Sequence, residues 1–301
     1  MAATEGRSPL VAAIVLNYNL PEVTERCVAS LLQSDYDPLH LIIVDNGSQD
    51  GSAEMLRGRF PQTTILASDR NLLFAGGMNL GLRHALAMGA DYALVLNNDT
   101  VVSREMVKRL VEAATSLPQA GIVAPLIRRA DGRLWSAGSQ RRGVCPFPRD
   151  VGRGKRATLP SQPFRVDYVT GCAMLIRHDV LKAIGLFDER YAMYYEDADF
   201  CVRAASAGYA LWVVPAAEMV HLVSESAKRQ APQSVYAHTR YRLRFYRQHH
   251  QPLWWVGLPS ILFQEGLRAV RDILTGYRHL ALARLRGMRD GLAEDLSPKG
   301  E

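Results

Sequence analysis

Four short runs of aliphatic and β-branched residues, separated by longer amphipathic segments, constrain the fold most strongly. Residues 21–32 and 76–88 carry apolar side chains on one stripe of a helix, as crossover helices do. Since consecutive βαβ units build a parallel sheet, we predict an α/β fold with a mainly parallel central sheet flanked by helices. The strand-like runs cover residues 10–16, 41–44, 64–67 and 92–96.

Later segments extend this α/β region and then change character. Further strand-like runs at 122–127, 168–176 and 211–214 carry the sheet to about His221. We therefore expect an α/β domain over residues 1–227 and a C-terminal helical extension over 228–301. Inside the domain, residues 141–163 are rich in Arg, Gly and Pro, which predicts a mobile basic loop.

The C-terminal extension combines basic charge with an apolar stripe. Alternating four- and three-residue spacing predicts an amphipathic helix with arginines beside its apolar face. Such a helix suits a membrane surface, but packing on the core or on another subunit of a homo-oligomer fits the pattern nearly as well. The stripe consists of Phe263, Leu267, Val270, Leu274 and Tyr277.

Composition limits the partners and the location. With 301 residues of which 48% are hydrophobic, the chain can bury a large core. Its net charge of +6 fits an anionic partner, which could be a nucleotide, a phospholipid surface or a nucleic acid. No apolar run is long enough to span a bilayer and none resembles an export signal, so we expect a cytoplasmic protein whose membrane association is peripheral. Its four cysteines form no C-x-x-C pair, which argues against a zinc site or disulfide framework.

Polar side chains follow the first two predicted strands where each one ends. The first strand ends in Asn17, Tyr18 and Asn19, and the second ends in Asp45, followed by Asn-Gly-Ser. Open α/β sheets bind ligands at the carboxyl ends of their strands. Asp45 could accept hydrogen bonds from a nucleobase or ribose, although an ordinary polar turn explains the same residues.

Two further motifs follow the third and fourth strands. Residues 70–79 contain the pair Gly76-Gly77, which could let the backbone approach a phosphate, although a flexible loop before a helix is an equal alternative. Asn97-Asn98-Asp99 offers oxygen ligands of the kind that Mg²⁺ or Mn²⁺ prefers, although a polar turn is again an alternative.

Three acids occur close together much later in the chain. Repulsion among Glu196, Asp197 and Asp199 is expected to raise at least one pKa toward the range of a general base. Helix capping and an Asp199–Arg203 pair would explain Asp199 but not the other two. His221 ends an apolar strand and, taken alone, is more typical of a structural histidine than of a metal ligand.

Taken together, these motifs resemble the inverting family-2 glycosyltransferases of the GT-A fold, particularly rhamnosyltransferase-like bacterial enzymes. The order and spacing are those of the family, over roughly the first four-fifths of the chain, and the combination is far more specific than any single piece. The matching strings are residues 16–19, 44–48, 71–79, 96–100, 169–171, 185–189, 195–199 and 215–221.

The resemblance also implies a role for each residue. Asp197 would be the catalytic base beside Glu196, and Asp99 and His221 would hold a divalent cation, Mn²⁺ or Mg²⁺. Many members have two or three aspartates where this chain has Asn97-Asn98-Asp99, so metal affinity would depend on the diphosphate of the donor. The donor site would contain Asn17, Tyr18, Asn19, Asp45, Arg70, Asn71, Gly76, Gly77, Asn79, Asn97 and Asn98, and the acceptor site Thr170, Gly171 and Asp199.

The implied reaction is the transfer of one sugar from a dTDP- or UDP-sugar, with dTDP-rhamnose the leading donor. The acceptor would be a saccharide or a polyprenyl-diphosphate-linked saccharide in cell-surface polysaccharide synthesis. A processive synthase is disfavoured because the chain has no Q-x-x-R-W string. A non-catalytic nucleotide-sugar or nucleic-acid binding module would fit the charge, but it leaves the acids and His221 unexplained, so no nucleic acid is expected.

Overall fold

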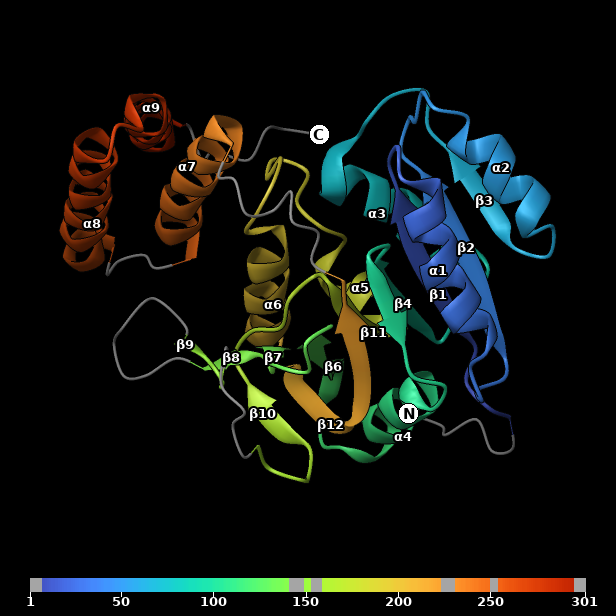
Figure 1. Ribbon diagram of the computed structural model, residues 1–301. Coiled ribbons are helices and arrows are strands. Elements are labelled where there is room, and N and C mark those ends of the chain that lie inside the picture. Colours follow the sequence, from blue (N-terminus) through green and yellow to red (C-terminus); the bar gives the residue numbers. More distant parts are fainter. Residues whose placement is uncertain (1–6, 141–148, 153–158, 223–230, 250–253, 295–301) are drawn as a thin grey trace.

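A computed structural model describes residues 7–140, 149–152, 159–222, 231–249 and 254–294. The expected α/β arrangement is present, with one large central sheet and helices packed on both sides of it (Figure 1). The strands are β1 Val11–Asn17, β2 Leu39–Asp45, β3 Thr64–Ala67, β4 Tyr92–Asn97, β5 Thr100–Val102, β6 Ala120–Arg129, β7 Leu134–Ser136, β8 Ser139–Gln140, β9 Arg149–Asp150, β10 Phe164–Val166, β11 Ala173–Arg177 and β12 Ala210–His221. The helices are α1 Pro21–Leu32, α2 Ser52–Arg59, α3 Leu73–Ala87, α4 Met106–Ser116, α5 His178–Ile184, α6 Glu196–Ser206, α7 Pro232–His249, α8 Trp254–Leu274 and α9 Arg278–Ala293.

The main sheet has the strand order β10-β12-β6-β11-β4-β1-β2-β3, with β5 added beside β12 and β7 beside β6. Strands β3, β2, β1 and β4 are parallel, as the βαβ spacing predicts. Strand β11 enters antiparallel between β4 and β6, and β6 and β12 are again parallel. The sheet is therefore mixed, with its parallel half in the amino-terminal part of the chain.

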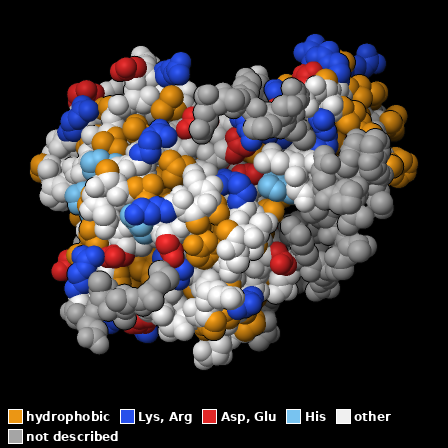
Figure 2. Space-filling model, turned by 180° about the vertical axis from the view of Figure 1, so that it is seen from behind, with side chains coloured by type: hydrophobic (Ala, Val, Ile, Leu, Met, Phe, Trp, Pro, Cys, Tyr) orange, Lys and Arg blue, Asp and Glu red, His pale blue; other side chains and the backbone are white. Residues whose placement is uncertain are grey.

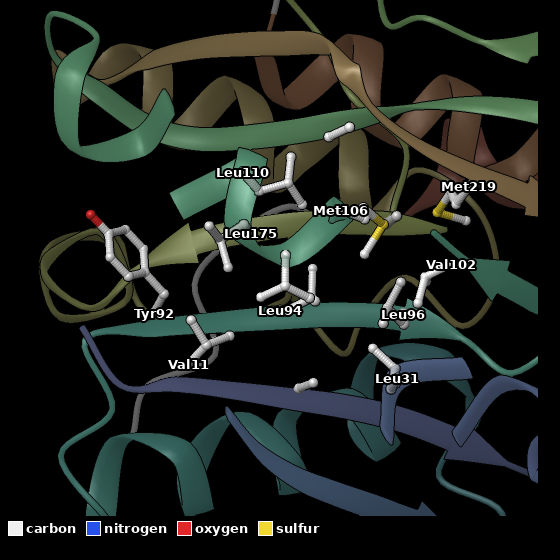
Figure 3. Close-up of a cluster of buried hydrophobic side chains, with 14 of the residues drawn as sticks. Val11, Leu31, Tyr92, Leu94, Leu96, Val102, Met106, Leu110, Leu175 and Met219 are labelled. Carbon is white, nitrogen blue, oxygen red and sulfur yellow. The ribbon is translucent and has the colours of Figure 1, made fainter. Parts of the chain in front are cut away.

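Helices cover both faces of the sheet, which explains why its strands are apolar without alternation. One face packs against α1, α2 and α4, and the other packs against α3, α5 and α6. Figure 3 shows the first of these clusters, in which Leu94 and Leu96 of β4 lie on the side of the sheet that faces Leu110 and Met106 of α4. Gly81 of α3 permits a close approach on the opposite face, since a Cβ there would lie 2.4 Å from Ile14 Cγ2.

Two antiparallel pairings place the end of β4 relative to distant parts of the chain. In the first, Ala173 of β11 pairs with Leu96, and the Asn97 amide donates to the Cys172 carbonyl at 3.0 Å. In the second, β5 pairs with β12 so that Thr100 lies opposite His221. Strand β12 continues past Pro215 to reach this position, and the proline is tolerated because the register shifts between Val214 and Glu218.

The three C-terminal helices form a separate layer beside α6 (Figure 1). Their interior contains ion pairs as well as apolar contacts. Fully buried Glu265 lies 2.6 Å from both Arg242 and Arg284, and Arg284 also reaches Asp272 at 3.1 Å. Thus part of the basic charge that the sequence placed beside an apolar stripe lies inside the helical layer, and the stripe itself is exposed. No helix within the described residues is both long enough and apolar enough to cross a membrane.

The sequence located most of the core elements and missed the short ones. Strand β3 and helix α1 have the predicted bounds, and β1, β2, β4, β6 and α3 are offset by a few residues. The run at 168–176 forms strand only from Ala173, and β5 and β7 through β10 were not anticipated. The predicted mobile loop at 141–163 lies largely outside the described residues, as does Cys145, whereas the other three cysteines are buried free thiols.

Candidate active site

A cavity of about 720 Å³ opens where the ends of β4 and β12 meet α6, α7 and the segment before β11, and we call it the main cavity. It unites groups that are far apart in the sequence, including both acids at the start of α6 and the imidazole at the end of β12. Its wall is formed in part by Asn97, Trp135, Tyr168, Thr170, Gly171, Glu196, Asp197, His221, His238, Arg242, Phe245 and Tyr246.

Asp197 is held rigidly by three hydrogen bonds. Its Oδ2 accepts from the Tyr168 hydroxyl at 2.7 Å and from the Gly171 amide at 2.8 Å, and its Oδ1 accepts from the Ala198 amide at 2.8 Å. A Cβ at position 171 would crowd the Phe74 ring at 3.1 Å and Asp197 Cβ at 3.3 Å, so glycine suits this close approach. Burial raises the pKa of Asp197 more than these bonds lower it. A carboxylate with about four acceptor positions keeps one for a substrate proton.

Glu196 lies beside Asp197 but is bonded differently. Only 8% of its surface is exposed, and its buried Oε2 has no hydrogen-bond partner among the described residues. Burial, together with the charge of Asp197, raises the pKa of Glu196 to about 8. This environment favours the protonated form of Glu196, which can donate a hydrogen bond to a group in the cavity.

The backbone immediately before these acids adopts a rare conformation. Tyr194 and Tyr195 have φ values of 71° and 70°, in the left-handed region that bulky residues avoid. The bend is held by aromatic packing, since the Tyr195 ring lies 5.5 Å from Phe245 and 5.4 Å from His238 of α7. Helix α7 thus fixes the entry of the chain into α6 and with it the direction of the two acids.

His221 lines another part of the same cavity, and Asp99 forms a pair with it. His221 Nε2 lies 3.0 Å from Asp99 Oδ2, and the imidazole packs edge-on against Trp135. Two ligand atoms at right angles, each about 2.1 Å from an ion, are separated by about 3.0 Å, so the pair fits a shared divalent cation. No cluster of three or more His, Cys, Asp or Glu side chains suited to a metal occurs within the described residues. Substrate phosphates and water are the usual remaining ligands of such an ion.

The expected nucleoside end of the site is a tight network at the ends of β1 and β2. Asn17 donates to Asp45 Oδ1 at 2.7 Å and accepts from Thr24 at 2.7 Å, while Ser48 donates to the same Asp45 oxygen at 2.7 Å. Asn17 and Asp45 are almost fully buried, whereas Tyr18 is 43% exposed and Asn19 is exposed beside it. The hydrogen-bond network thus fixes the carboxyl ends of β1 and β2, and Tyr18 and Asn19 are the residues there that a ligand can reach.

Several residues of the 70–79 motif have structural explanations. Gly77 lets α3 approach the sheet, since a Cβ there would lie 2.5 Å from Leu16 Cδ1. The Asn79 amide donates to the Phe187 carbonyl and to Glu189, each at 2.9 Å, and Asn79 Oδ1 accepts from the Phe187 amide. Buried Asn79 is thus better explained as an anchor for the 185–189 segment than as a donor ligand.

Some of the remaining residues expected at the donor site serve packing, and others stay accessible to a ligand. A Cβ on buried Gly76 would lie 2.9 Å from Leu72 Cβ, so this glycine also serves packing. Arg70 and Asn71 are exposed and stay candidates for donor contact. At the end of β4, Asn97 lines the main cavity, while the Asn98 amide donates to Thr24 at 2.9 Å.

Asp199 does not contact the main cavity, which corrects its expected role in acceptor binding. The side chain is fully buried and accepts from Arg203 at 2.7 Å, Gln248 at 3.1 Å and His249 at 2.7 Å. The Arg203 bond is the i,i+4 pair that the sequence offered as the alternative. Asp199 therefore fastens α6 to the end of α7, while Thr170 and Gly171 do line the cavity.

Sequence reasoning missed several parts of the wall. Tyr168 and Trp135 contact Asp197 and His221, but neither belongs to a polar motif. The contributions of α7, which include His238 and Arg242, were missed because residues 228–301 were treated as a separate extension. The basic and aromatic character of α7 was the only available signal.

Comparison with known proteins identifies the family. Residues 12–185, more than half of the chain, match Glycosyl transferase family 2. The chain belongs to this family. It is therefore a glycosyltransferase, and the resemblance inferred from its motifs is confirmed.

Relatives cover nearly the whole transferase chain. The N-acetylglucosaminyl-diphospho-decaprenol L-rhamnosyltransferase of Mycobacterium tuberculosis is 28% identical, over 93% of this chain and 97% of the relative. Galactofuranosyltransferase GlfT1 of Mycolicibacterium smegmatis is 27% identical, over 90% of this chain and 92% of the relative. The mannosyltransferase PcManGT of Pyrobaculum calidifontis, solved with GDP-Man and Mn²⁺, superposes with a TM-score of 0.61 at 16% identity, over 95% of this chain and 88% of that one. The structural match confirms the GT-A fold.

The raised pKa of Glu196 predicts a pH dependence of the transferase's stability. The ordinary pKa is 4.5 and the folded value about 8, so the folded state disfavours the charged form. The contribution of Glu196 to the free energy of unfolding is therefore fully present below pH 4.5 and is lost as the pH rises toward 8. In urea unfolding at a series of pH values, Glu196→Gln should remove most of this loss. If the free energy of unfolding of the wild type and of Glu196→Gln changed with pH in parallel, the raised pKa of Glu196 would be contradicted.

Proposed function

We propose that this protein is a metal-dependent inverting glycosyltransferase that moves one sugar from a nucleoside diphosphate to a hydroxyl of a saccharide acceptor. The observation that carries the proposal is the main cavity itself, whose wall contains both Asp197 and His221 and so unites the acids with the Asp99–His221 pair. A base and a cation site on one cavity provide what a single displacement needs.

The donor and acceptor are inferred from the relatives and the charge. Two relatives are an N-acetylglucosaminyl-diphospho-decaprenol L-rhamnosyltransferase and a dTDP-rhamnosyl transferase, whereas another is a galactofuranosyltransferase. These names support dTDP-rhamnose as the leading donor and a lipid-linked saccharide as acceptor in cell-envelope glycan synthesis. A UDP-sugar is the alternative donor.

Each residue has a defined part in the proposed displacement. The remaining acceptor position of Asp197 takes the proton of the attacking hydroxyl, while Tyr168 and Gly171 keep the carboxylate aimed. Protonated Glu196 donates to a substrate oxygen nearby. Asp99 and His221 would hold Mn²⁺ or Mg²⁺ together with the diphosphate, and the ion when bound neutralises the charge of the leaving group.

Replacing Asp197 by Asn should lower kcat by about 100- to 10,000-fold, because the amide cannot accept the proton. The KM for the donor should change little, since the nucleoside and cation sites are untouched. Initial rates of sugar transfer and donor binding by calorimetry would measure the two effects. As a control, Asp131→Asn makes the same chemical change in the exposed turn between β6 and β7 and should leave kcat unchanged. Retention of near-normal kcat by Asp197→Asn would refute the assignment of the base.

Replacing His221 by Ala should raise the Mn²⁺ concentration needed for half-maximal transfer by about 10-fold or more, because it removes one of two protein ligands. The exposed histidine His279 of α9 provides the control, as His279→Ala. Electron paramagnetic resonance of Mn²⁺, with nucleoside diphosphate present, gives a readout independent of turnover. Equal Mn²⁺ affinity in both variants would remove His221 from the proposed cation site.

We also propose that the transferase works at the cytoplasmic face of an anionic membrane through an apolar face on α8. This face consists of Phe263, Leu267, Val270, Ile273 and Leu274, which are 48% to 81% exposed. Figure 2 shows hydrophobic side chains gathered at the upper right, where α8 and α9 lie, with basic side chains beside them. Exposed arginines at 278, 286 and 289 complement anionic headgroups.

A paired substitution tests this membrane face. Leu267→Gln with Leu274→Gln should lower partitioning onto phosphatidylglycerol vesicles by about 10-fold or more, because two apolar side chains no longer gain from burial. Leu32→Gln with Met55→Gln, on exposed positions of α1 and α2, is the matched control. Vesicle flotation measures the bound fraction. If the first pair instead converts a dimer to a monomer without changing flotation, the face belongs to a second copy.

A further inference from the structure

A second pocket of about 500 Å³ lies between α7, α8 and α9 and shares two wall residues with the main cavity, Tyr194 and His238. The shared residues make the two spaces neighbours across a single aromatic partition. We call the second space the arginine pocket. Its polar lining consists of Tyr194, Ser234, His238, Arg268, Arg271 and Arg284.

The arginine pocket carries an excess of positive charge. Glu265 already accepts from Arg242, Arg268 and Arg284, and Asp272 accepts from Arg284. With Arg271, whose Nη2 lies 3.7 Å from an Asp272 oxygen, four guanidinium groups face two carboxylates. Burial lowers the pKa of His238, so the excess comes from arginine rather than histidine.

The three lining arginines differ in how they are held. Arg284 is 5% exposed and fixed by its bonds to Glu265 and Asp272. The side chains of Arg268 and Arg271 are 43% and 69% exposed, so many of their donors are accessible. A fixed buried cation beside two accessible guanidiniums suits an anion with several oxygens, since guanidinium pairs well with phosphate in bidentate geometry.

The position of the arginine pocket determines which phosphate it suits. On one side, past Tyr194 and His238, lies the cavity with Asp197. Arg268 and Arg271 of the arginine pocket belong to α8, the helix that also carries the exposed Leu267 and Leu274 of the apolar face. The order along the surface is acid, arginine, apolar face, which matches the order saccharide, diphosphate, lipid.

We propose that the arginine pocket binds the diphosphate of a lipid-linked saccharide acceptor, with the sugar reaching past Tyr194 to Asp197 and the lipid lying on the apolar face of α8. This inference rests on the proposed function, because it specifies the acceptor of that reaction. It assigns Arg268 and Arg271 to acceptor binding and leaves the Asp99–His221 end to the diphosphate of the donor.

Direct binding of farnesyl diphosphate in mild detergent tests the pocket without turnover. Arg268→Gln with Arg271→Gln should raise the dissociation constant about 10-fold or more, as loss of charge-assisted bonds predicts. Arg286→Gln with Arg289→Gln removes the same charge from exposed positions of α9 and should change it less than about 2-fold. If both double variants weaken farnesyl diphosphate binding equally, or if neither weakens it, the proposal is overturned. If the first pair fails to fold, Arg271→Gln alone gives the same test, because that side chain is 69% exposed.

Competition distinguishes the possible sources of phosphate. Inorganic pyrophosphate should displace farnesyl diphosphate, whereas short-chain phosphatidylglycerol should not. Weakening of farnesyl diphosphate binding by His221→Ala would place the ligand in the donor site, and displacement by phosphatidylglycerol would assign the arginines to bilayer headgroups. Either result would overturn the proposal.

Kinetics separate failure of this inference from failure of the proposed function. The Arg268/Arg271 pair should raise the KM for a diphosphate-linked acceptor about 10-fold or more, with kcat and the KM for an alkyl glycoside of the same sugar unchanged. Transfer with an unaltered KM would overturn the arginine pocket and leave the reaction standing. Absence of transfer to any acceptor, with selective loss of farnesyl diphosphate binding, would overturn the reaction and leave the anion site standing.

Discussion

The hydrogen-bonded end of β4 is the constraint on which the site depends. The Asn97 amide donates to the Cys172 carbonyl, and the neighbouring Gly171 amide donates to Asp197. One short path of backbone thus joins the strand that leads to Asp99 with the acid at the start of α6. Because β4 is buried between parallel and antiparallel neighbours, this path cannot shift without breaking the core. The relative position of the two chemical groups is therefore a property of the sheet.

The C-terminal helices complete the same arrangement from the other side. Asp199 is bonded to His249, and the ring of Tyr195 packs on Phe245, so α7 holds both ends of the first turn of α6. The cost of burying Glu265 is offset by three arginines, and burial raises its pKa less than these partners lower it. The sequence predicts these helices as a basic extension, but they orient Glu196 and Asp197 and form part of the cavity wall.

The sequence predicted what depends on periodicity and strand ends, and it failed where the outcome depends on three-dimensional contact. Strands β1 to β4 were recognisable because both of their faces are covered, which leaves uninterrupted apolar runs. The resemblance to the family was enough to predict that Asp99 and His221 act together. In contrast, Asn79 and Asp199 fit that motif equally well, yet packing encloses both, and a motif cannot distinguish a polar group that faces a ligand from one that anchors a neighbouring segment. The contribution of α7 depends on contacts between distant residues, which no local pattern encodes.

The distribution of charge around the cavity bears on how two anionic substrates could be held at once. Two diphosphates close together repel each other strongly in a site of low effective dielectric, so each needs its own counter-charge. The proposed cation site at Asp99 and His221 and the excess arginine charge beside Tyr194 belong to different elements. Glu196 and Asp197 line the main cavity, which contains His221 and shares Tyr194 with the arginine pocket. Donor and acceptor diphosphates placed at these two positions would direct both sugars toward the acids. The two neutralising sites would thus orient the reactants as well as bind them.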